Sequence, residues 1–242
     1  MSVKAVFGET GETGFQRQFQ QGNAFYQKGN YKEAIALYEG ILSQGLQSAA
    51  LYYNLGNTYF KSKNLGRCVL NYERALRLAP EETELLNNLS FVREILVDKV
   101  DISEAPSWFK KMMRPYHSLS LNGAALFASL FYALILLCAA YAVHSLSFRS
   151  VFFKRLFIPF LILFLFFAGI GISKFIERRF AAAIVVVEEL DVRYGPSPDE
   201  TRAFVLHSGT KCTIRETSGN WCLIWLSNDR GGWVPQEGVE RI

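Results

Sequence analysis

The chain has 242 residues, of which 50% are hydrophobic and 20% charged, with a formal net charge of +4. This length leaves room for two small soluble domains beside a membrane segment, and a single enzyme core of ordinary size does not fit beside one. The modest charge does not favour nucleic-acid binding, because the basic residues gather beside the apolar runs, where they would meet lipid headgroups.

Residues 1–14 are expected to form a flexible lead-in. Their three glycines superficially resemble a phosphate loop, but no Lys follows the last one, and Glu9 and Glu12 would repel a phosphate. The stretch also lacks an apolar core long enough for a signal peptide. We therefore expect either that the amino terminus stays in the cytoplasm or that the true start lies upstream.

Residues 15–82 repeat with a period of 34 residues. The recurring pairs are Gly22-Asn23 with Gly56-Asn57, Phe25 with Tyr59, Asn30 with Asn64, Ala34 with Cys68, and Tyr38 with Tyr72. This period, with small and aromatic residues at these positions and Pro80 closing the second unit, resembles the tetratricopeptide repeat. The units are 15–48 and 49–82, and 83–97 is a capping helix. An ordinary helical bundle is the alternative.

The resemblance implies a concave face built from the first helix of each repeat. The side chains expected there to bind a partner are Asn23, Tyr26, Asn54, Asn57, Lys61 and Asn88. Side-chain amides can bond the backbone of an extended peptide, although Asn is also common on ordinary exposed helix faces. Phe19, Glu84 and Asn88 stand where the carboxylate-clamp version of the fold has basic residues, so capture of a free carboxyl terminus is not expected.

Two uncharged apolar runs follow, Pro115–Phe148 and Leu156–Ser173. Each run reaches the roughly 20 residues that cross a bilayer. The second is apolar on all sides, which argues against buried helices of a soluble core. The sequence therefore predicts a hairpin of two transmembrane helices with both soluble flanks on one side of the membrane.

From Ala183 the pattern changes to alternation with frequent turn residues, which predicts a small all-β barrel. The pieces Leu190–Pro196, Asn220-Trp221 and Gly232–Pro235 resemble bacterial SH3-like domains. On this resemblance a groove would be lined by Arg193, Tyr194, Trp221 and Trp233. The alternative is that the tryptophans merely fill the barrel.

No catalytic residues, metal site or cofactor are expected. The histidines at 117, 144 and 207 are scattered, and no Ser, Cys or carboxylate constellation accompanies them. The four cysteines show no metal-ligand spacing, and a disulfide framework is not expected.

The sequence therefore predicts a multidomain membrane protein: an all-α tetratricopeptide repeat solenoid, a two-helix transmembrane hairpin and a small all-β SH3-like barrel. The predicted boundaries are a lead-in at 1–14, repeats with their cap at 15–98, a juxtamembrane linker at 99–118, transmembrane helices at 119–145 and 156–174, a basic loop at 146–155, a second linker at 175–182, and the SH3-like domain at 183–242.

This order of domains resembles the aerotolerance-operon membrane proteins of the BatE type. The resemblance implies a non-enzymatic scaffold in a bacterial envelope complex, working with membrane proteins that carry von Willebrand A domains and with a MoxR-type ATPase. The alternative function is a cell-envelope anchor whose SH3-like domain binds peptidoglycan.

Two arguments about the side of the membrane on which the soluble domains lie oppose each other. The outer flanks of the hairpin carry six basic residues and its loop carries three, which favours cytoplasmic domains. The resemblance implies the periplasm instead. We favour a two-pass protein of the bacterial inner membrane whose soluble domains are periplasmic.

Overall fold

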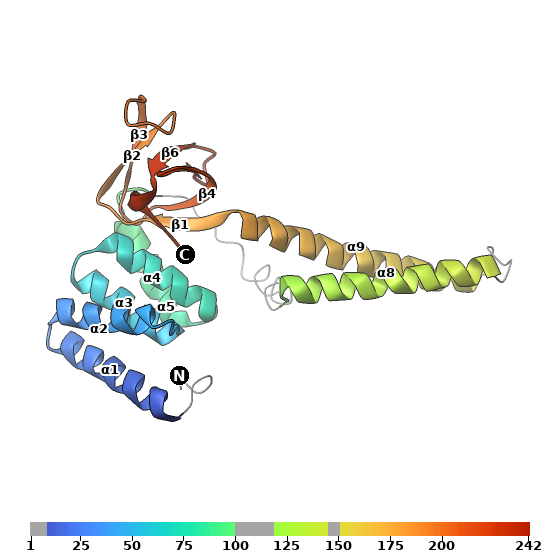
Figure 1. Ribbon diagram of the computed structural model, residues 1–242, viewed down its shortest axis with the longest axis horizontal. Helices are drawn as coiled ribbons and strands as arrows, with labels where there is room; N and C mark the ends of the chain where they lie inside the picture. The colour runs from blue at the N-terminus through green and yellow to red at the C-terminus, as the bar shows by residue number, and fades with distance from the viewer. Residues whose placement is uncertain (1–8, 100–118, 145–150) are drawn as a thin grey trace. The chain divides into compact units, whose positions relative to one another are not determined.

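The computed structural model describes residues 9–99, 119–144 and 151–242 (Figure 1). The contacts of the chain divide it into two compact units, Met1–Ile102 with Ala181–Ile242, and Ser103–Phe180. Most of the predicted lead-in, nearly all of the first linker and half of the basic loop lie outside the described residues.

Five helices form the first part of unit 1: α1 (Glu9–Gln27), α2 (Tyr31–Ser43), α3 (Ala49–Lys61), α4 (Leu65–Leu78) and α5 (Thr83–Ile95). Side chains cap two of them, since Ser48 accepts a bond from the Leu51 N–H and Asn64 one from the Arg67 N–H, both at 3.1 Å. The α1–α2 and α3–α4 turns share a left-handed residue, Gly29 in the first (φ 78°) and Lys63 in the second (φ 65°). The 34-residue period is thus repeated in the backbone.

Close approach within each helix pair depends on a glycine. A Cβ at Gly22 would lie 2.6 Å from the Tyr38 ring, and a Cβ at Gly56 would lie 2.6 Å from the Tyr72 ring. Both tyrosines are buried, at 1% and 2% exposure. The glycine and the tyrosine therefore work as one packing unit in each repeat.

The second part of unit 1 is a seven-stranded antiparallel sheet. Its strands are β1 (Ala181–Val185), β2 (Glu189–Arg193), β3 (Arg202–His207), β4 (Lys211–Ser218), β5 (Trp221–Trp225), β6 (Gly231–Pro235) and β7 (Val239–Arg241), with a short helix η1 (Gln236–Gly238) before β7. The order is β3-β2-β6-β5-β4-β1-β7. No pairing joins β3 to β7 among the described strands, so the sheet is open and the closed SH3-like barrel is not confirmed.

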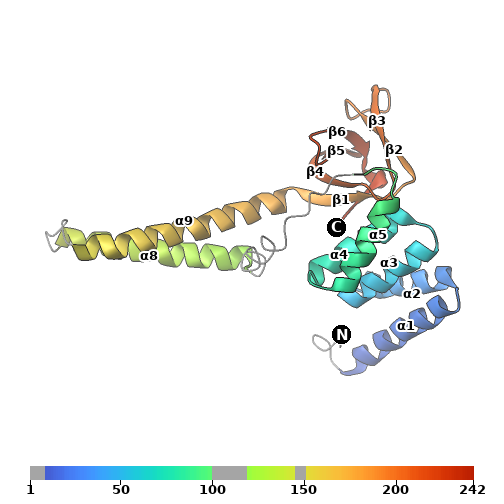
Figure 2. The ribbon, with the colours of Figure 1, turned by 180° about the vertical axis from the view of Figure 1, so that it is seen from behind.

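The strand β1 belongs to two hydrophobic cores. Ala183 and Val185 point into the core of the sheet, whereas Ile184 is buried in the core of the repeats. Neighbouring side chains of a strand point to opposite faces, so β1 packs against the core of the sheet with one face and against the core of the repeats with the other. In Figures 1 and 2 the sheet lies against the α4 and α5 end of the helical stack. Repeats and sheet therefore form a single compact unit.

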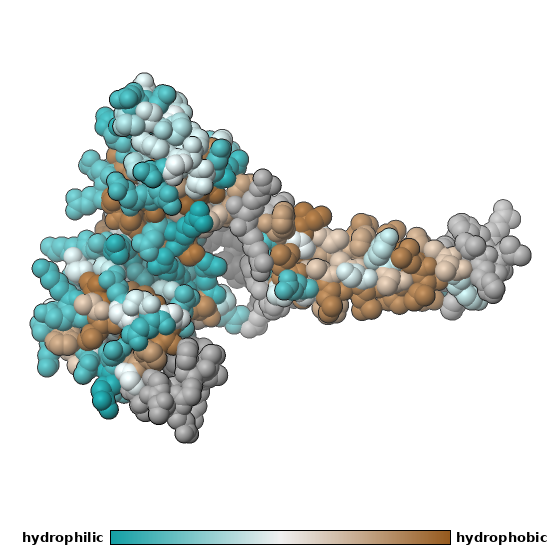
Figure 3. All heavy atoms as spheres, in the orientation of Figure 1, coloured by the Kyte–Doolittle hydropathy of each residue, from teal (hydrophilic) through white to brown (hydrophobic). Residues whose placement is uncertain are grey.

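Unit 2 is a helical hairpin of α8 (Leu121–His144) and α9 (Val151–Arg179). Aromatic rings pack between the helices, with Phe167 stacked on Phe127 at 5.0 Å and on Phe131 at 5.7 Å between ring centroids. Both helices are long and apolar enough to cross a membrane, over Leu121–Tyr141 and Arg155–Phe175. Their side chains are almost all unburied, and the hairpin is predominantly hydrophobic in Figure 3.

Candidate functional site

One face of the repeats carries the asparagines at 23, 54, 57 and 88, and we call it the asparagine face. It is formed by α1 and α3, the first helices of the two repeat units, and by α5, which follows them. Hydrogen bonds link the helices across this face. The Asn54 Nδ2 donates to the Asn23 Oδ1 at 2.9 Å, and the Asn88 Nδ2 donates to the Tyr53 hydroxyl at 2.8 Å. These bonds link α1 to α3 and α3 to α5 through three of the predicted asparagines, at 23, 54 and 88.

A tyrosine from the second helix of each repeat fixes one asparagine. The Tyr38 hydroxyl donates to the Asn23 Oδ1 at 2.6 Å, and the Tyr72 hydroxyl donates to the Asn57 Oδ1. Burial raises the pKa of Tyr38 to about 12 and raises the pKa of Tyr72 as well, so both hydroxyls keep their protons and act as donors. Because the amide oxygens are engaged, it is an amide N–H of Asn23 or Asn57 that would meet an acceptor such as a peptide carbonyl, and the Asn57 amide also interacts with the Tyr53 hydroxyl.

The face changes character at α5. The Tyr53 hydroxyl donates to the Glu84 Oε1 at 2.6 Å, and beyond this pair the rings of Phe60 and Phe91 meet edge to face at 6.0 Å between centroids. Phe91 is 55% exposed and Ile95 is 47% exposed. The asparagine face therefore ends in an apolar patch, which we define as Phe60, Phe91 and Ile95.

Sequence reasoning missed Tyr53, Phe91 and Ile95, and it named Glu84 only as a departure from the carboxylate clamp. A helical spacing was present, because residues 84, 88, 91 and 95 recur at intervals of three or four and so share one side of α5. The two remaining predicted residues lie at the ends of helices. Tyr26 packs against Tyr31 at 5.8 Å between ring centroids, and Lys61 is exposed at the end of α3.

The residues predicted to line a groove in the sheet are in part brought together. Arg193 stands opposite Trp233 in the β2–β6 register, and Trp221 is a diagonal neighbour of Trp233 on β5. The Arg193 guanidinium donates to the carbonyls of Pro198 and Glu200 at 2.8 and 2.7 Å, so it holds the following loop. Tyr194 projects from the sheet and is 72% exposed.

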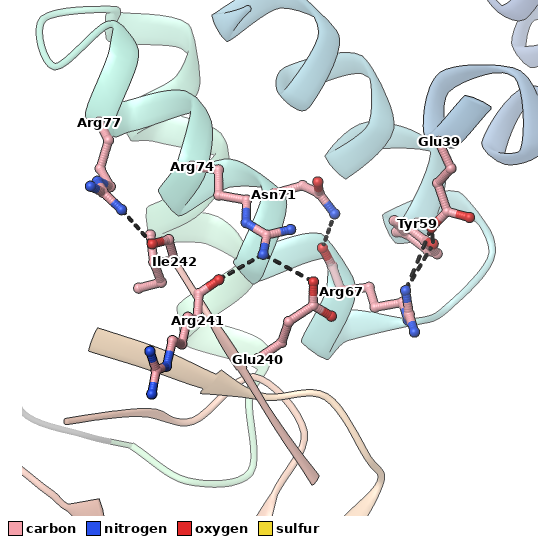
Figure 4. A network of polar contacts seen from close by, with 9 residues as sticks. All are labelled: Glu39, Tyr59, Arg67, Asn71, Arg74, Arg77, Glu240, Arg241 and Ile242. Carbon is pink, nitrogen blue, oxygen red and sulfur yellow. Dashed lines mark hydrogen bonds and ion pairs between the residues drawn. The ribbon is translucent and has the colours of Figure 1, made fainter. Parts of the chain in front are cut away.

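A second polar cluster joins the repeats to the sheet, and we call it the repeat–sheet contact. Its centre is the Glu73 carboxylate, only 4% exposed, which pairs with Arg93 at 2.7 Å and with Lys211 of β4 at 2.8 Å. Figure 4 shows its edge at β7, where Arg74 bonds the Glu240 carboxylate at 2.9 Å and the Arg241 carbonyl at 2.6 Å. Arg77 donates to the Ile242 carbonyl beside them.

Asp98, which follows α5, completes the repeat–sheet contact. Its carboxylate accepts the His207 N–H at 2.6 Å and the Thr210 hydroxyl at 2.7 Å, and it lies 3.0 Å from the His207 Nδ1. Burial alone would raise the pKa of Asp98, but the bonds from the His207 N–H, the Thr210 hydroxyl and the His207 ring together hold it below the ordinary 3.8. The ionised form is therefore the one that stabilises the fold.

Acid should weaken the repeat–sheet contact through Asp98. A carboxyl group whose pKa is lowered by folding contributes stability above its unfolded pKa, and this contribution is lost as the pH falls through the folded value. We expect Asp98→Asn to cost about 1–2 kcal/mol at neutral pH, as charge-assisted bonds are lost, and to cost less below the ordinary 3.8. Urea unfolding of both proteins across this range measures the difference, and a cost independent of pH would contradict the assignment.

Comparison with known proteins identifies the class of the helical part. The tetratricopeptide repeat matches residues 49–82 and, in a second match, residues 16–43. These matches cover the two units that present the asparagine face from α1 and α3. No curated protein matches the chain. The chain thus contains two tetratricopeptide repeats, a motif typical of protein–protein interaction scaffolds and not of enzymes.

Proposed function

We propose that this chain is a membrane-anchored scaffold that binds an extended segment of a partner protein on its asparagine face. The observation that carries the proposal is the repeated pair of a buried tyrosine and an asparagine, Tyr38 with Asn23 and Tyr72 with Asn57. Each pair turns an amide into a fixed donor at equivalent positions of two repeats. Donors held in advance reduce the entropy lost when a ligand is ordered.

The chemistry of the face also indicates what kind of segment it binds. Amide nitrogens at Asn23 and Asn57 suit the carbonyl oxygens of an extended backbone. In an extended segment these oxygens are not engaged in the hydrogen bonds of a helix. The apolar patch at the α5 end suits a hydrophobic side chain, since Phe91 and Ile95 are about half exposed. The proposed ligand is therefore an extended segment with a large apolar residue toward one end.

Replacing Asn23 and Asn57 together by alanine should reduce partner capture about tenfold or more, because two backbone hydrogen bonds are lost. Capture is measured by quantitative mass spectrometry of proteins retained by the tagged full chain from detergent-solubilised membranes. The exposed Lys32→Ala on α2 is the control and should leave capture unchanged.

A second variant separates binding from folding. Tyr38→Phe with Tyr72→Phe removes the hydroxyls that fix the amides but keeps the buried rings, so capture should fall less than in the double asparagine variant. Circular dichroism should show unchanged helicity in both. Equal capture by wild type and the double asparagine variant would refute binding on this face.

The anchoring part of the proposal rests on α8 and α9. We propose that both cross the bilayer, with the repeats and the sheet on the periplasmic side of the bacterial inner membrane. Supporting this, each helix has a span that is long, apolar and unburied. A reporter fused after Ile242 and active on only one side of the membrane tests the orientation.

The partners are proposed from the domain order alone. By its resemblance to proteins of the BatE type, the scaffold would act with membrane proteins that carry von Willebrand A domains and with a MoxR-type ATPase, and its sheet would be a variant of the SH3-like domain. The competing proposal is an anchor that binds peptidoglycan, for which the exposed Tyr194 is the supporting feature. Recovery of wall fragments without a protein partner would favour the competitor.

A further inference from the structure

Among the described strands β3 pairs with β2 alone, so the open sheet leaves a free edge along β3. The direction of the main-chain groups along β3 is fixed by the bond from the Ser208 N–H to the Glu188 carbonyl at 3.1 Å, which points toward β2. Groups alternate along an antiparallel strand, so the N–H of the preceding residue, His207, points to the free edge. It meets the Asp98 carboxylate there at 2.6 Å.

Val205 lies two residues before His207, so its N–H and carbonyl face the same free edge. Among the described residues no strand pairs with β3 on this side, and none bonds Val205 there. The Asp98 carboxylate occupies only the end of the edge, at His207. The edge therefore presents an unused donor and acceptor at Val205, which is the arrangement that a further strand requires.

A cavity of about 330 Å³ opens beside Val205. Its apolar lining includes Phe204, Leu206 and Leu226, which belong to or flank the core of the sheet. The cavity lies between β3, the turn that joins β5 to β6, and the segment after α5. An apolar side chain from an added strand would extend the core at this point.

Two cations line the same cavity. The Arg230 guanidinium lies over the Phe204 ring at 4.2 Å from its centroid, and Lys99 enters from the segment after α5. Neither forms an ion pair with another described residue. Among the described residues of the lining, Asp98 is the one carboxylate, and it is engaged by His207 and Thr210. The cavity therefore favours an acidic ligand.

We infer that the free edge of β3 is a docking site for an extended acidic segment of a partner protein. The segment adds a strand beside Val205, places an apolar side chain in the cavity and sets a carboxylate near Lys99 and Arg230. This site is separate from the asparagine face, and it gives the sheet a binding role that does not depend on the repeats.

The test uses the full chain in detergent micelles and a fluorescent octapeptide of alternating valine and glutamate, blocked at both ends. We expect saturable binding by fluorescence anisotropy. N-methylation of alternate peptide amides removes the strand hydrogen bonds, and it should weaken binding about tenfold or more. Absence of saturable binding to the wild type would overturn the inference.

Two substitutions at the edge form a matched pair. Val205→Pro removes the outward N–H while leaving the bonds to β2 intact, which an edge strand tolerates, and Val205→Thr keeps that N–H. The proline variant should bind the octapeptide about tenfold more weakly, and the threonine variant should bind like the wild type. Equal binding by folded wild type and proline variants would exclude pairing at Val205.

A third variant decides the matter even if the proline variant does not fold. Lys99→Glu with Arg230→Glu reverses the cavity charge and should abolish binding of the acidic octapeptide, whereas Lys32→Glu on α2 should not. Unchanged binding by the reversed variant would overturn the charge assignment. The Asn23→Ala and Asn57→Ala variant should bind the octapeptide normally, so a failure at β3 is distinguishable from a failure of the asparagine face.

Discussion

Glu73→Ala lowers the free energy of unfolding by about 2–3 kcal/mol. The carboxylate is 4% exposed and holds both Arg93 and Lys211. Breaking a buried pair costs about 3–5 kcal/mol, and the cost is smaller here because Arg93 and Lys211 remain 26% and 36% exposed and can regain water.

Urea unfolding of the full chain in micelles measures this loss, followed by the fluorescence of the tryptophans in β5 and β6. The control is Arg202→Ala, which removes an ion pair to Asp191 with side chains that are 61% and 41% exposed. Its cost should stay below about 1 kcal/mol. Similar costs for both variants would show that burial of Glu73 does not decide its contribution.

Gly66→Ala should destabilise the fold by about 1–3 kcal/mol, because it forces the sheet away from α4. A Cβ at Gly66 would lie 2.7 Å from the Val185 carbonyl oxygen and 3.0 Å from the Val186 Cα. These are backbone atoms that cannot turn aside, so the clash must move a strand, which overrides the gain in helix propensity.

Gly40→Ala is the matched control for this substitution. Gly40 is also helical, in α2, and a Cβ there would meet nothing within 4 Å. We expect this variant to be stabilised by about 0.5–1 kcal/mol, which thermal unfolding monitored by circular dichroism resolves. If both alanines changed stability in the same direction, contact between α4 and the sheet would not be the cause.

The helical part could be predicted from sequence because its signals are local. Gly22 recurs as Gly56 and Tyr38 recurs as Tyr72 at a fixed period, and this period reflects one helix pair at a time. That each glycine packs on its tyrosine came from the structure. The asparagines were placed on a common side by the same period. How the tyrosine hydroxyls fix them depends on side-chain geometry, which no spacing in the sequence specifies.

The repeat–sheet contact could not be predicted, because its partners are far apart in the chain. Glu73 and Lys211 are separated by 138 residues, and Asp98 and Thr210 by 112. No local pattern couples such positions. One signal was available in β1. The residues from Ala181 to Val187 are all apolar and do not alternate with polar ones. A run of this kind is typical of a strand covered on both faces.

Closure of the sheet was also beyond local signals. Alternation and turn residues predict strands. Which strand pairs with each edge depends on residues that are far apart in the sequence. At the β3 edge the Asp98 carboxylate accepts the His207 N–H, which a neighbouring strand would otherwise bind. The Asp98 side chain thus stands at an edge that a closed barrel would have paired with another strand.

The two-core strand β1 also has a consequence for the order of folding. Ile184 and Leu96 are both buried in the core of the repeats. The surface that Ile184 covers on residues 9–99 therefore stays exposed until residues 181–242 have been synthesised. The chain must therefore close a loop over the hairpin. The pairing of α8 with α9 sets Ala124 against Gly171. It therefore holds the start of α8 and the end of α9 at the same end of the hairpin. Because closure entropy grows with loop length, a hairpin formed first shortens the search and favours late joining of the sheet to the repeats.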